Sequence, residues 1–116
     1  MEKAAWEASN REHFAAHLRQ MSQAMSDHHA AEREAVAGDA PALELLQRDH
    51  DKQLLKWERT KTRLSAEFEE QVATLQENPD FNPRQPPKPE YPDWVWDCGM
   101  LVPGTYGPPQ ERSRDR

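Results

Sequence analysis

The fold is decided by residues 41–77, which read PALELLQRDHDKQLLKWERTKTRLSAEFEEQVATLQE. When these residues are placed 100° apart around an axis, the large apolar side chains fall within one sector, as on a helix that buries one face. The sector contains Leu43, Leu46, Leu54, Trp57, Leu64, Phe68, Val72 and Leu75. Asn78-Pro79 ends the pattern, so the stretch predicts one helix of about 55 Å at 1.5 Å per residue.

The side of this helix opposite the apolar sector is basic between residues 48 and 63. Its cations follow one another at spacings of 4, 4, 3 and 4, and they are Arg48, Lys52, Lys56, Arg59 and Arg63. We call them the basic ladder, and one interpretation is that it faces the phosphates of RNA. The alternative is a solvated face, because Asp49, Asp51 and Glu58 interleave with the ladder.

Residues 2–37 contain neither proline nor glycine and predict a first helix. Its apolar stripe consists of Trp6, Phe14, Leu18, Met21 and Met25. Asn10, Ser22 and Ser26 lower the helix propensity, so we expect a break in this helix. Gly38 suits a helix C-cap, Asp39 or Ala40 an N-cap, and Pro41 a first helical turn. Two helices joined by so short a link predict a helical hairpin over residues 1–78.

Residues 82–96, NPRQPPKPEYPDWVW, hold five of the ten prolines and two of the four tryptophans. Proline fixes φ and removes an amide donor, so this run predicts an extended, polyproline-like arm. The expected fold is therefore mainly α: a long hairpin, then an extended proline- and aromatic-rich arm and an irregular C-terminal tail over residues 79–116. The rings at the end of the arm suit a partner's pocket. Alternatively, the two tryptophans fold back onto the chain's own helices as core.

The same run resembles a segment of a mitochondrion-specific ribosomal protein family, large-subunit protein number fifty-four. The positions that match the family's pattern are Pro83, Pro87, Glu90, Tyr91, Pro92, Asp93, Trp94 and Trp96. Asn82 and Val95 depart mildly from it, and about 15 of the 116 residues are covered. Family members usually continue into a basic helical tail, whereas this chain continues with residues rich in proline and glycine.

The resemblance implies a non-catalytic accessory protein of the mitochondrial large ribosomal subunit, with ribosomal RNA and ribosomal proteins as partners and the mitochondrial matrix as location. The eight matching residues would form the partner-binding anchor. Arg84 and Lys88 would meet phosphates near the anchor, and the basic ladder would do so farther away. The mitochondrial interpretation rests on this resemblance alone, because the start of the chain is too acidic for an ordinary transit peptide.

Composition narrows the function classes. The net charge of −6 argues against a surface that wraps nucleic acid throughout, so any RNA contact is expected to be local. We expect no enzyme activity, cofactor, metal or small-molecule substrate: the four glycines form no phosphate-binding loop, and His13 and His17 have no third ligand at zinc-site spacing. No apolar run is long enough to span a membrane.

Two other functions remain open. An acidic hairpin with a proline-rich arm could clamp the subunits of a respiratory or other organellar complex without touching RNA. A self-associating coiled coil is a third alternative, although His50 and Lys61 interrupt its heptad pattern.

Overall fold

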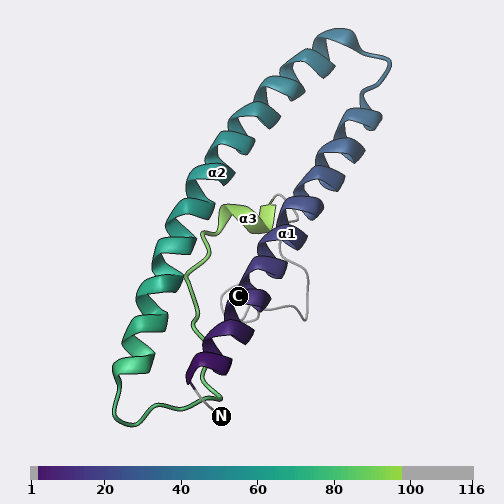
Figure 1. Ribbon diagram of the computed structural model, residues 1–116. Helices are drawn as coiled ribbons and strands as arrows, with labels where there is room; N and C mark the ends of the chain where they lie inside the picture. The colour runs from purple at the N-terminus through teal and green to yellow at the C-terminus, as the bar shows by residue number, and fades with distance from the viewer. Residues whose placement is uncertain (1–2, 98–116) are drawn as a thin grey trace, which may run out of the picture.

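The computed structural model describes residues 3–97, and it confirms a mainly helical fold built on a long hairpin. Helix α1 spans Lys3–Ala35, α2 spans Ala40–Glu77, and the short α3 spans Trp94–Asp97. The two long helices lie antiparallel, and the arm returns from the far end of α2 to place α3 near their middle (Figure 1). The predicted tail from residue 98 onward lies outside the described residues.

The turn between the long helices is capped as its sequence predicts. Asp39 is the N-cap of α2, with φ of −122° and ψ of 94°, and its side chain accepts a hydrogen bond of 3.1 Å from the Ala42 amide. Pro41 stands in the first turn of α2, where its missing amide proton leaves no unpaired donor. These local features fix where the chain reverses.

The expected break in α1 is wrong, because the helix runs without interruption from Lys3 to Ala35. Two of the three polar residues that suggested a break make hydrogen bonds compatible with a helix. Asn10 Nδ2 donates to the Trp6 carbonyl at 2.9 Å, and Ser22 Oγ accepts from Trp57 Nε1 of α2 at 2.9 Å. Packing against α2 therefore outweighs their low helix propensity.

A single apolar seam between α1 and α2 forms the core, and the arm completes it. At its centre the rings of Phe14 and Phe68 stack with centroids 4.3 Å apart. The buried apolar residues are Trp6, Phe14, Met21, Met25, Trp57, Leu64, Phe68, Val72, Tyr91 and Val95. The last two belong to the arm and α3. The predicted stripe of α1 thus lies in the core, with Leu18 packed against its edge.

The apolar sector predicted for α2 is only partly buried near the turn. Leu54 is 47% exposed, and Leu43 and Leu46 are half-buried. The described part of the arm ends at α3, beside Trp57, so no described segment covers Leu54 on its outer side. None of the described helices combines the length and the apolar character needed to cross a membrane.

Candidate functional site

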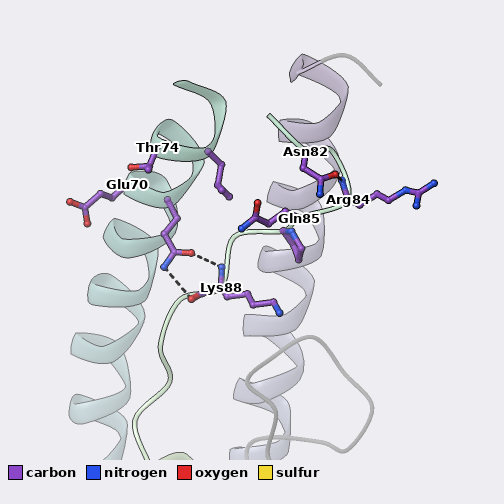
Figure 2. Close-up of a pocket in the computed structure, with 9 residues that line it drawn as sticks. Glu70, Thr74, Asn82, Arg84, Gln85 and Lys88 are labelled. Carbon is purple, nitrogen blue, oxygen red and sulfur yellow. Dashed lines mark hydrogen bonds between the residues drawn. The ribbon is translucent and has the colours of Figure 1, made fainter. Parts of the chain in front are cut away.

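The arm is held along α2 by side chains that grip its backbone. Gln71 Nε2 donates to the Lys88 carbonyl at 3.1 Å, and its Oε1 accepts from the Lys88 amide, as the two dashed lines in Figure 2 show. One helical turn away, Glu67 Oε1 accepts from the Glu90 amide at 2.8 Å. Prolines alternate with these residues and have no amide proton, so α2 pairs two of the few donors that this part of the arm can offer.

Tyr91 is the aromatic residue of the arm that is buried in the core. It is 3% exposed, its ring meets that of His17 edge-on with centroids 5.4 Å apart, and its hydroxyl lies 3.3 Å from His17 Nδ1. Burial lowers the pKa of His17 to about 4, so the imidazole is neutral at physiological pH. The structure therefore places Tyr91 in the chain's own core, an outcome that the sequence had suggested for the two tryptophans and not for this tyrosine.

The other predicted anchor residues divide between core and surface. Pro87 is buried, and Pro92 is half-buried. Trp94 is half-buried: it contacts Trp57 edge-on at 6.4 Å between centroids, and Lys56 Nζ lies 4.8 Å from its ring centroid. Three anchor residues remain exposed, namely Pro83, Glu90 and Asp93. The side chain of Trp96 lies outside the described part of the structure.

A hollow of about 680 Å³ opens between the end of α2 and the first part of the arm. Glu70 and Thr74 stand on its α2 side, and Asn82 and Gln85 face them from the arm, while Arg84 extends away from it (Figure 2). Its lining offers amide, hydroxyl, carboxylate and cationic groups.

The basic ladder lies on α2 with all five of its side chains exposed. Three of them are engaged within the chain: Arg48 pairs with Glu44 at 3.2 Å, Lys56 covers Trp94, and Arg63 lies 3.4 Å from the Glu90 carbonyl. Lys52 and Arg59 make no ion pair or hydrogen bond with the described part of the chain. Arg84 and Lys88 are exposed on the arm.

A cluster of histidines near the turn was missed in the sequence. His29 of α1 and His50 of α2 are each 4% exposed, and their rings stack 3.7 Å apart at an interplanar angle of 8°. His29 Nε2 lies 2.6 Å from Gln53 Oε1, and His50 Nε2 lies 2.8 Å from Glu32 Oε1. Burial lowers the pKa of His29, and the bond to His50 lowers the pKa of Glu32.

A signal for this cluster does exist in the sequence. His29 stands seven residues before the turn at residues 36–39 and His50 eleven residues after it, so an antiparallel hairpin brings both into the same part of the seam. Comparison with known proteins adds no relative: no family model, curated protein or solved structure matches the chain.

Proposed function

We propose that this chain is a non-catalytic structural accessory protein of the mitochondrial large ribosomal subunit. The observation that supports this most is the basic ladder, an exposed row of cations in which Lys52 and Arg59 have no partner within the described chain. The resemblance of residues 82–96 to the ribosomal family supplies the choice of assembly.

The ladder suits a small RNA contact. From Arg48 to Arg63 it extends about 22 Å along the helix axis at 1.5 Å per residue. Beyond it, α2 becomes acidic with Glu67, Glu69 and Glu70. Because phosphate binding depends on local neutralisation, a net charge of −6 is compatible with such a restricted footprint.

The arm would serve this function in two ways. Tyr91 and Pro87 hold it against the hairpin, which presents a preformed shape and lowers the ordering cost of assembly. The exposed residues Glu90 and Asp93, with Pro83 at the start of the arm and the uncovered part of the half-buried Trp94, would then meet the partner. Arg84 and Lys88 would add phosphate contacts beside them.

A second candidate function is an accessory subunit of an organellar protein complex without RNA. The exposed leucines of α2 that a protein partner would cover in such a complex are Leu45 at 61%, Leu54 at 47% and Leu55 at 60% exposure. This alternative also fits the acidic net charge.

Sedimentation of native extracts separates the two functions. The chain is expected to sediment with large ribosomal subunits and to leave the high-mass fractions when RNA is digested. If it stays in a particle of unchanged size after nuclease treatment, the ribosomal proposal fails and the protein-only complex is supported.

Charge reversal tests the ladder itself. We expect the double variant Lys52→Glu, Arg59→Glu to dissociate from large subunits at lower salt than wild type. Each lost phosphate contact lowers the slope of log K against log salt by about 0.7 to 0.9. Arg19→Glu, which alters an exposed cation of α1, is the matched control. Equal salt sensitivity in all three proteins would exclude the ladder as the RNA contact.

A further inference from the structure

We propose that His29, Glu32 and His50 bind a divalent transition-metal ion, with zinc the best match, and that this ion joins α1 to α2 near the turn. One potential ligand atom from each of the three residues lies within 4.8 Å of the others. The inference is independent of the ribosomal proposal, because it depends on other residues at a different part of the hairpin.

The donor set fits zinc and its neighbours. Two imidazole nitrogens and one carboxylate oxygen form a common open zinc site, whereas calcium and magnesium prefer oxygen ligands throughout. Zinc–ligand bonds of about 2.0 to 2.2 Å in a tetrahedron put donors about 3.3 Å apart. The metal-bound form would require the stacked rings to turn, so that one nitrogen of each faces the Glu32 carboxylate.

The surroundings of His29, Glu32 and His50 favour a bound metal ion. Both imidazoles are buried in the seam, each 4% exposed, so solvent has little access to an ion bound between them. His50 Nε2 lies 2.8 Å from Glu32 Oε1, so an ion bound between these two atoms would replace the proton that they share. Glu32 stands in the last turns of α1, where the helix dipole favours a cation.

Gln53 offers a further oxygen beside the three proposed ligands. Gln53 Oε1, which lies 2.6 Å from His29 Nε2, can orient that ring or supply a fourth ligand. His28 Nε2 lies 3.5 Å from Glu32 Oε2 and can orient the carboxylate in the same way. A metal-free alternative exists, in which the same side chains form only a hydrogen-bonded polar contact within the seam.

The test uses the full chain after removal of metals with a chelator. Titration with zinc chloride in a calorimeter should give one zinc ion bound per chain. In a thermal unfolding scan, the melting temperature should be higher with zinc than without it. Cobalt substitution should give the visible absorption of a four-coordinate ion. His50→Gln should abolish zinc binding, the rise in melting temperature and the cobalt absorption. Gln53→Ala should weaken zinc affinity about 10- to 100-fold, as substitution of a residue that orients a metal ligand typically does.

Two further variants keep the test decisive. Glu32→Gln removes a ligand charge at a half-buried position and should weaken zinc binding even if His50→Gln fails to fold. His13→Gln, which changes an exposed histidine of α1, should bind zinc like wild type. The proposal is overturned if the wild-type chain takes up no zinc, or if Glu32→Gln and His50→Gln bind it as tightly as wild type.

Discussion

Acid should destabilise this protein through His17, and His17→Gln should remove that effect. The folded-state pKa of His17 is about 4, against 6.5 for a free imidazole, because the ring is buried in the seam. Between these two values the unfolded chain holds a proton that the folded chain does not. Stability is therefore fully present above pH 6.5 and falls as the pH drops toward 4.

The magnitude follows from the size of the pKa change. Each unit of pKa corresponds to about 1.36 kcal/mol, which sets a ceiling of about 3 kcal/mol for the full change. A charged His17 could relax toward water, so we expect about 2 kcal/mol to be lost between pH 7.5 and 4.5. Below that range the carboxylates of Glu7 and Glu32, whose pKa values are lowered by hydrogen bonds, add to the loss.

Urea unfolding at a series of pH values measures this dependence. His17→Gln keeps a polar group beside the Tyr91 hydroxyl but cannot take up a proton. Between pH 7.5 and 4.5 its free energy of unfolding should therefore fall by about 2 kcal/mol less than that of wild type. His13→Gln removes an exposed imidazole one turn away and serves as the control. Parallel curves for wild type and His17→Gln would refute the argument from burial.

Two stability predictions concern the hairpin. Phe68→Ala should lower the free energy of unfolding in urea by about 3 to 5 kcal/mol, because it leaves a cavity at the centre of the seam. Its control is Leu55→Ala, at a side chain 60% exposed, which should cost under about 0.5 kcal/mol. Similar losses in the two variants would mean that the seam is not the core. Asp39→Ala should lower the free energy of unfolding by about 1 kcal/mol by removing the cap on the Ala42 amide. Asp49→Ala, at an exposed mid-helix position, is its control, and an unchanged stability of Asp39→Ala would show that the cap contributes nothing.

Local signals in the sequence were enough to predict the hairpin. The periodicity of residues 41–77 and the Gly38–Pro41 turn signal depend on neighbouring residues, so the helices begin and end within about two residues of the predicted bounds. Leu54 was misassigned to the core because a helical sector describes one helix by itself. Its burial depends on whether another segment covers that side, which periodicity does not encode.

The burial of Tyr91 in the core depends on tertiary structure. An extended aromatic run is compatible with a partner's pocket and with the chain's own groove, and the grip of Glu67 and Gln71 on the arm involves residues far apart in sequence. The His29–His50 contact likewise arises from the register of α1 against α2. The proposed roles of the basic ladder and of the outward arm residues stay predictions, because they depend on partners.

The arm is docked in the hairpin by its own amides and rings. Amide hydrogen exchange, resolved by residue, tests this most directly at Lys88 and Glu90, whose N–H groups donate to Gln71 and Glu67. Both amides are expected to exchange slowly in the isolated chain. Tyr91→Ala should make them exchange fast, while the amides of α1 and α2 stay protected. Exchange of both amides at the rate of an unfolded peptide in the wild-type chain would contradict the docking of the arm.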